Sequence, residues 1–150
     1  MPFGPSEIVE FLAHHDRKEW DSSVESIALV SQPTPDVFIN YIRYKKVMMI
    51  SSRDILIASK VVKLQNGTMI ASTSIEHNEY SPADDVVRAN IDIAGYYIQP
   101  SEQENMHQVL ALLSGSFGGN IPNALAKKTM EINVPKNLKA MNVMMQKIYQ

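Results

Sequence analysis

One pair of charged residues has a spacing that could do chemistry. Arg17 and Asp21 are four positions apart, so they share a face if the helix predicted for residues 6–20 persists. One interpretation is a surface ion pair beside a core Trp20. The other is an arginine that faces a cavity and binds an anion, with Asp21 holding it in place. Arginine suits a phosphate because its planar fork donates two hydrogen bonds at once.

No other residues form a recognisable catalytic constellation. The four histidines lack the i, i+4 spacing with which one helix face grips a metal, and the chain has no cysteine. Gly118-Gly119 lacks the frame of a phosphate-binding loop, and Ser114-Gly115-Ser116 lacks that of a nucleophile elbow. We therefore expect no metal, no cofactor and no enzymatic activity.

Length and composition favour one globular domain. The chain has 150 residues, of which 45% are hydrophobic, and a formal net charge of −2. A chain of this length buries roughly 70% of its unfolded surface, which is enough for a core. The near-neutral charge gives no electrostatic case for nucleic acid. With no signal peptide, no membrane-length apolar run and no cysteine, the sequence predicts a cytoplasmic protein.

The order of elements predicts an α+β fold. Residues 6–20 predict a helix, and residues 123–149 predict a second one, interrupted or kinked near Pro135. Between them lie about six mostly consecutive antiparallel strands, predicted at residues 24–30, 37–44, 54–64, 69–75, 87–98 and 106–114. Helices and sheet are segregated along the chain, as in α+β folds. A single long helix covering a curved sheet leaves room for an internal cavity.

Four short motifs resemble a known family. The motifs are Arg17-Lys18-Glu19-Trp20-Asp21, Ser52-Arg53-Asp54, Val86-Val87-Arg88, and Gly118-Gly119-Asn120-Ile121-Pro122 followed by Val134-Pro135 and Leu138-Lys139-x-Met141. In this order they resemble the START domain, the lipid-transfer domain related to steroidogenic acute regulatory protein, and within it the phosphatidylcholine transfer protein branch. The resemblance implies a helix-grip fold, a curved antiparallel sheet around a long C-terminal helix.

The resemblance also implies a function. Family members hold one lipid in a tunnel between sheet and helix, without catalysis. In the phosphatidylcholine carrier, the residue at the position of Arg17 contacts the lipid phosphate. The residue at the position of Asp21 supports that arginine. In that carrier, aromatic residues surround the choline group, and two of their positions are occupied here by Asn40 and Ile55. In the sterol branch, a charged residue lies in the cavity at a position that is Ser59 here. The resemblance therefore favours a phospholipid but carries over neither choline nor sterol specificity.

A lipid-binding site follows from these expectations. We expect acyl chains to lie against the sheet and the last helix, with Arg17 at the phosphate and Asp21 orienting it. The expected wall comprises Ile55, Ile57, Met69, Ala71, Ile75, Leu138, Met141 and Met145. An alternative assigns the helix methionines to ordinary core.

The apolar run Val47-Met48-Met49-Ile50 is the expected entrance loop. Lys45 and Lys46 precede it, so the loop could dip into a membrane while the two lysines meet lipid headgroups. This predicts transient contact with a membrane surface. The alternative is core at the end of a strand.

Length is the main departure from the family. An N-terminal helix and about three strands normally precede the point where this chain begins, so we expect an N-terminally shortened domain. The missing strands would expose a sheet edge that can pair with another chain, which predicts a homodimer. An alternative function is thus a regulatory or interaction module that associates through this edge and transfers nothing.

Overall fold

A computed structural model describes residues 1–47 and 49–149 of the chain. Two helices flank a continuous β region. The elements are α1 (Pro5–His14), the 3-10 helix η1 (Arg17–Glu19), β1 (Val24–Thr34), β2 (Val37–Tyr44), β3 (Arg53–Leu64), β4 (Gly67–Ser74), β5 (Val87–Arg88), β6 (Asn90–Pro100), β7 (His107–Ser116) and α2 (Asn123–Tyr149).

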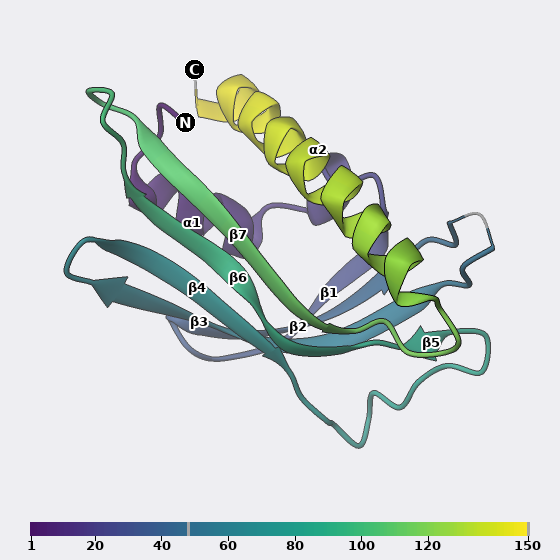
Figure 1. Cartoon of the computed structure of the whole chain (residues 1–150). Helices are drawn as coiled ribbons and strands as arrows, with labels where there is room; N and C mark the ends of the chain where they lie inside the picture. The colour runs from purple at the N-terminus through teal and green to yellow at the C-terminus, as the bar shows by residue number, and fades with distance from the viewer. Residues whose placement is uncertain (48, 150) are drawn as a thin grey trace.

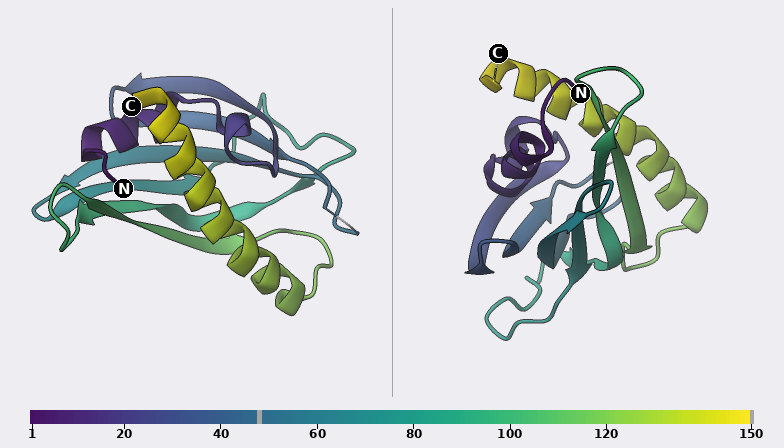
Figure 2. Two further views of the ribbon diagram at one scale, coloured as in Figure 1. Left: turned by 90° about the horizontal axis from the view of Figure 1, so that it is seen from above. Right: turned by 90° about the vertical axis from the view of Figure 1, so that its left-hand side faces the viewer.

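The strands form one curved sheet in the order β1-β2-β3-β4-β6-β7. Neighbouring strands on this path are antiparallel, and the short β5 pairs in parallel with the start of β3. Both helices lie on the concave side, where α2 crosses the sheet diagonally (Figures 1 and 2). This confirms the predicted α+β helix-grip fold, with seven strands where about six were expected.

The first predicted helix is shorter than the sequence suggested. α1 ends at His14, and His15 has extended backbone angles. The Asp16 carboxylate then accepts a hydrogen bond from the Lys18 backbone N–H and caps η1. Short polar side chains such as aspartate compete in this way with a continuing helix, which explains the break.

The structure differs from the sequence prediction at three further places: the end of β1, residues 87–98 and Pro135. β1 runs through Pro33 to Thr34, which is possible because β1 is an edge strand with one row of unpaired N–H groups. Residues 87–98 form two strands, since β5 pairs with the start of β3 and β6 pairs with β4 only from Ala94 onward. Pro135 does not interrupt α2, which is one helix from Asn123 to Tyr149 with Pro135 on its exposed side.

Two apolar clusters divide the interior. One, here called the solid core, joins α1 and the second half of α2 to the sheet, and comprises Phe3, Ile8, Phe11, Trp20, Ile98, Met141 and Met145. The other, here called the cavity cluster, lies on β1, β2, β3, β6 and the residue before β6, and comprises Val24, Ile42, Ile55, Ile57, Ala89 and Ile91. The first half of α2 lies over this second cluster.

Candidate functional site

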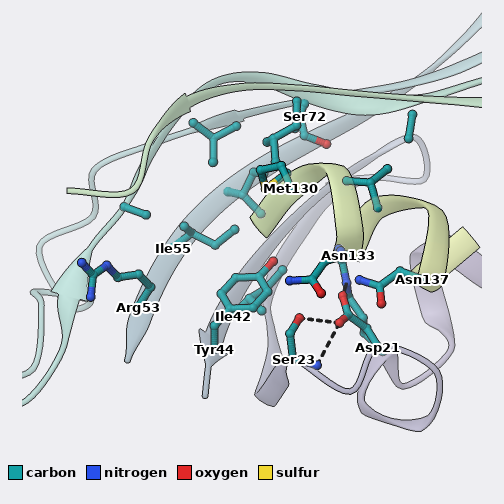
Figure 3. Close-up of a pocket in the computed structure, with 18 of the residues that line it drawn as sticks. Asp21, Ser23, Ile42, Tyr44, Arg53, Ile55, Ser72, Met130, Asn133 and Asn137 are labelled. Atoms are coloured by element: carbon teal, nitrogen blue, oxygen red, sulfur yellow. Dashed lines mark hydrogen bonds and ion pairs between the residues drawn. The ribbon is translucent and has the colours of Figure 1, made fainter. Parts of the chain in front are cut away.

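A cavity of about 280 Å³ lies between the concave face of the sheet and the first half of α2. Its volume is close to the lower end of the range of small-molecule pockets, roughly 300–1,000 Å³. Apolar side chains from the cavity cluster and from α2 make most of its wall, and polar groups gather at one end, where Asp21, Ser23, Tyr44, Asn133 and Asn137 lie (Figure 3). A wall of this kind suits an apolar ligand with one polar end.

Arg17 and Asp21 are joined at this polar end. Arg17 Nε donates to Asp21 Oδ2 at 3.1 Å, and both residues line the cavity. The Asp21 side chain is only 1% exposed, and its other oxygen accepts hydrogen bonds from the backbone and the hydroxyl of Ser23. A buried, fully engaged carboxylate holds the guanidinium in one orientation.

The local backbone brings the pair together without a continuous helix. The Asp21 N–H donates to the Arg17 carbonyl at 2.8 Å, which is one α-helical turn following η1. The guanidinium also lies over the Trp20 ring, with Cζ 5.3 Å from the ring centroid. Trp20 belongs to the solid core, so this cation–π contact fixes Arg17 from behind.

The Arg17 guanidinium keeps donor capacity for a ligand. Within residues 1–47 and 49–149, its one recorded hydrogen bond is from Nε, so the two terminal Nη groups are left for another acceptor. Burial opposes its charged form, but Tyr44, Tyr96 and Asp21 outweigh that effect and raise the pKa of Arg17. The site therefore presents a permanent, oriented positive charge inside an apolar cavity.

α2 contributes two amides to the same end of the cavity. Asn133 and Asn137 are one turn apart on the inward face, beside the apolar Met130 and Leu138. Lys136 Nζ reaches Ser22 Oγ at 3.4 Å, so this part of α2 lies against the segment that carries Asp21.

Three small polar side chains on adjacent strands interrupt the apolar floor of the cavity. Ser59 of β3 and Ser72 of β4 face each other and share a hydrogen bond of 2.7 Å. Asn40 of β2 is only 8% exposed and also lines the cavity. The Asn40 amide makes no hydrogen bond to another described residue.

The cavity brings together only some of the predicted site residues. Arg17, Asp21, Ile55, Ile57 and Leu138 line it. Met69, Ala71 and Ile75 do not line it. Ser59 pairs with Ser72 and Val61 with Ile70, so the inward positions of β4 are Ile70 and Ser72, and the alternate positions Met69 and Ala71 face outward. Ile75 lies beyond the end of β4.

Met141 and Met145 were also expected on the lipid wall, and the structure places them elsewhere. Both are fully buried in the solid core, against α1 and Trp20. This placement agrees with the alternative that assigned the helix methionines to ordinary core. The reason is that α1 fills the space beneath the second half of α2.

The predicted entrance loop lies at the rim of the cavity. Val47 and Ile50 line the cavity and exchange two backbone hydrogen bonds. Met49 points into solvent and is 96% exposed. Met48, also expected here, lies outside the described residues.

Three of the motifs that resemble the family contact one another in the structure, namely those that contain Asp54, Arg88 and Gly118. Arg88 donates twice to the buried Asp54, at 2.8 and 3.0 Å, and Tyr41 Oη donates to the same carboxylate. Arg53 donates to the Gly118 carbonyl at 3.1 Å. Gly118 has a φ of 66°, and a Cβ there would lie 2.7 Å from the Arg88 carbonyl oxygen. These motif residues therefore hold the framework beside the cavity.

Sequence reasoning missed several polar cavity residues, namely Tyr44, Tyr96, Asn133 and Asn137. A signal for the asparagines was present. Asn133 and Asn137 precede Met141 and Met145 at a spacing of four, so the amides continue the buried face of the helix. The tyrosines gave no signal, because aromatic residues are common in strands of any kind.

Comparison with known proteins agrees with this architecture. The sequence model of the START domain family matches residues 3–149. START domain-containing protein 10 of human and mouse is 25% identical over 125 residues, which are 83% of this chain and 43% of those proteins. The chain thus spans less than half the length of these curated relatives.

Two solved structures share the fold. The crystal structure of human STARD10 superposes with a TM-score of 0.84 at 24% identity, over 95% of this chain and 58% of that one. Human StAR-related lipid transfer protein 5 gives 0.85 at 15% identity, over 97% and 71%. With the family match extending over nearly the whole chain, and the cavity where a helix-grip fold places it, the chain belongs to the START domain family.

Proposed function

We propose that this domain binds one phospholipid in its cavity, with the phosphate on Arg17 and the acyl chains along the cavity cluster and the first half of α2. One observation carries the proposal: Arg17 lines an apolar cavity, tied through Nε to a buried Asp21, with both Nη groups left for an acceptor. Removing acyl chains from water drives binding, at roughly 0.8 kcal/mol per methylene. Human StAR-related lipid transfer protein 5, which is named for lipid transfer, shares this fold.

Arg17 variants test the phosphate anchor. We expect Arg17→Ala to lower phospholipid capture from liposomes by at least about tenfold, because a charged hydrogen bond contributes roughly 1.5–3 kcal/mol. Arg17→Lys should restore little, since an ammonium cannot replace both arms of the fork. Captured lipid is measured by native mass spectrometry of the purified protein.

Arg43→Ala is the matched control. Arg43 pairs with Glu25 and Asp85 at the surface, at 2.6 Å each, and does not line the cavity. Its removal should leave capture unchanged. Unchanged capture by Arg17→Ala would refute the anchor.

The entrance loop is proposed as the membrane contact. Met49 is almost fully exposed between two rim residues, and the preceding lysines can meet anionic headgroups. We expect Met49→Ser to slow lipid transfer between vesicles several-fold while the amount of lipid bound at equilibrium stays the same. Leu64→Ser, which changes an exposed residue at the end of β3, is the control. Equal transfer rates for the two variants would contradict this role.

An interaction module is the second candidate function, and one observation favours it. β7 is an edge strand, and its Leu110, which does not line the cavity, is 46% exposed. An open apolar edge can pair with a second copy. Size-exclusion chromatography with light scattering separates the two functions: a tight dimer without extractable lipid favours the interaction module, and a lipid-loaded monomer favours the carrier.

A further inference from the structure

The cavity is lined by amide groups on β2 and on α2 that make no hydrogen bond to another described residue. No side-chain hydrogen bond of Asn40, Asn133 or Asn137 to another described residue is recorded, although all three line the cavity. Asn40 is more than nine-tenths buried between Phe38 and Ile42 on the inward face of β2. Asn133 and Asn137 are half-buried, so their free amides can pair with water or with a polar ligand that enters the cavity.

Helix propensity does not explain the two asparagines of α2. Asparagine is a weak helix former in the interior of a helix, and both residues lie well inside α2. The same face carries Thr129, whose hydroxyl is already satisfied by the Leu125 carbonyl at 2.8 Å. The amides of Asn133 and Asn137 have no such local partner recorded, and Figure 3 shows them projecting from α2 into the pocket, by Asp21.

Their chemistry complements the Arg17 site. Arg17 supplies only donors, and the Asp21 oxygens are occupied by Arg17 and Ser23. Free acceptors at this end therefore come from the amide oxygens of Asn133 and Asn137 and from the Tyr44 and Tyr96 hydroxyls. A headgroup with N–H or O–H donors can pair with these oxygens, whereas a trimethylammonium group has no hydrogen to donate.

We infer that Asn133 and Asn137 select a phospholipid headgroup that carries hydrogen-bond donors, a primary ammonium or hydroxyls, over choline. This inference rests on the proposed function, because it assumes that the phosphate lies on Arg17. The phosphate then lies between the guanidinium and α2, and the group attached to it meets the two amides. Arg17 and Asp21 set where the lipid is held, and the asparagines set which headgroup is preferred.

A series of lipids that differ by single methyl groups tests the selection. Vesicles hold equal amounts of dioleoyl phosphatidylethanolamine, its N-methyl and N,N-dimethyl derivatives, and phosphatidylcholine, so phosphate, charge and acyl chains stay constant. Native mass spectrometry resolves the captured species by mass. We expect capture to fall with each methyl group, with a preference of ethanolamine over choline of roughly fivefold, as expected for one net hydrogen bond.

A second arm separates the two kinds of donor. Dioleoyl phosphatidylglycerol added to the same vesicles offers hydroxyls in place of the ammonium. Capture at the level of phosphatidylethanolamine assigns the amides to donors of either kind, and capture near the level of phosphatidylcholine assigns them to the ammonium.

Variants assign the preference to the helix. The double variant Asn133→Leu/Asn137→Leu should capture phospholipid but treat all four methylation states alike. Gln146→Leu, the same loss of an amide at an exposed position of α2 outside the cavity lining, should keep the preference. Circular dichroism confirms that each variant is folded.

The outcomes distinguish the inference from the proposed function. Equal capture of the four lipids by the unaltered chain overturns the inference and leaves phospholipid binding intact, as would a preference that survives in the double variant. Capture of no phospholipid at all overturns both.

Discussion

Two arginines line the same cavity, and their hydrogen bonds give them different tasks. Arg53 donates from Nε, Nη1 and Nη2 to the carbonyls of Phe117, Ser51 and Gly118, at 2.8, 2.6 and 3.1 Å. Burial lowers its pKa, and every one of its nitrogens is engaged by the backbone. Arg53 thus ties together the two loops beside the cavity. Arg17 uses one nitrogen and keeps two, so it is the arginine that can hold an anion.

The buried carboxylate of Asp54 is the residue on which the framework depends most. It is fully buried and accepts hydrogen bonds from Arg88 and from Tyr41. Replacing it removes the charge that compensates a partly buried guanidinium. We expect Asp54→Asn to lower the free energy of unfolding by about 3 kcal/mol.

Urea unfolding followed by circular dichroism measures this change. Glu25→Gln is the control, because it likewise replaces a carboxylate with an amide, but in the exposed ion pair with Arg43. It should lower the free energy of unfolding by less than about 1 kcal/mol. Similar costs for the two variants would contradict a central role for the Asp54–Arg88 pair.

At the scale of the helices and strands, the sequence predicted which segments form them. It predicted less well which face of each segment is buried. The strands and the long helix were recognisable because alternation and helical spacing are local signals. The pairing of Arg17 with Asp21 was also predictable, since one helical turn survives after η1 although α1 ends earlier. The face of β4 was not: Met69 and Ala71 alternate as cleanly as Ile70 and Ser72, and only the register with β3 decides between them.

Gly95 is a glycine that β6 requires because the backbone of β4 approaches it closely. It has a φ of 152°, and a Cβ there would lie 1.8 Å from the Ile70 carbonyl oxygen. The contact is with backbone, so no side-chain movement can relieve it. We expect Gly95→Ala to lower the free energy of unfolding by about 3 kcal/mol.

The paired position provides the control for this strand. Ala71 lies opposite Gly95 in β4. Ala71→Gly perturbs the same pair without a clash and should cost about 1 kcal/mol through lost entropy alone. A Gly95→Ala protein as stable as the parent in urea would show that β4 and β6 can separate at this point without cost.

The interior of the molecule has two halves, a solid core and a cavity, which the sequence did not distinguish. A single lipid wall was expected from Ile55 through Met145, because apolar content alone does not separate a packed core from a cavity lining. In the structure, α1 packs into one half with Met141 and Met145 and makes it solid. The other half, under the first part of α2, holds the cavity. Only the position of α1 in space distinguishes the two halves.

This division predicts where a bound lipid changes the dynamics of the domain. Phospholipid that contacts residues 123–138 must be released before their backbone hydrogen bonds open, whereas Met141 and Met145 are already packed without it. With free lipid at about 100 times its Kd, such openings become up to about 100-fold rarer. We therefore expect amide hydrogen exchange to slow in residues 123–138 on loading and to change little in residues 141–149, measured by mass spectrometry on lipid-free and lipid-loaded protein. Arg17→Ala, at the same lipid concentration, should lose most of this protection. Equal slowing along all of α2 would mean that the helix closes as one rigid body and that the two halves are coupled.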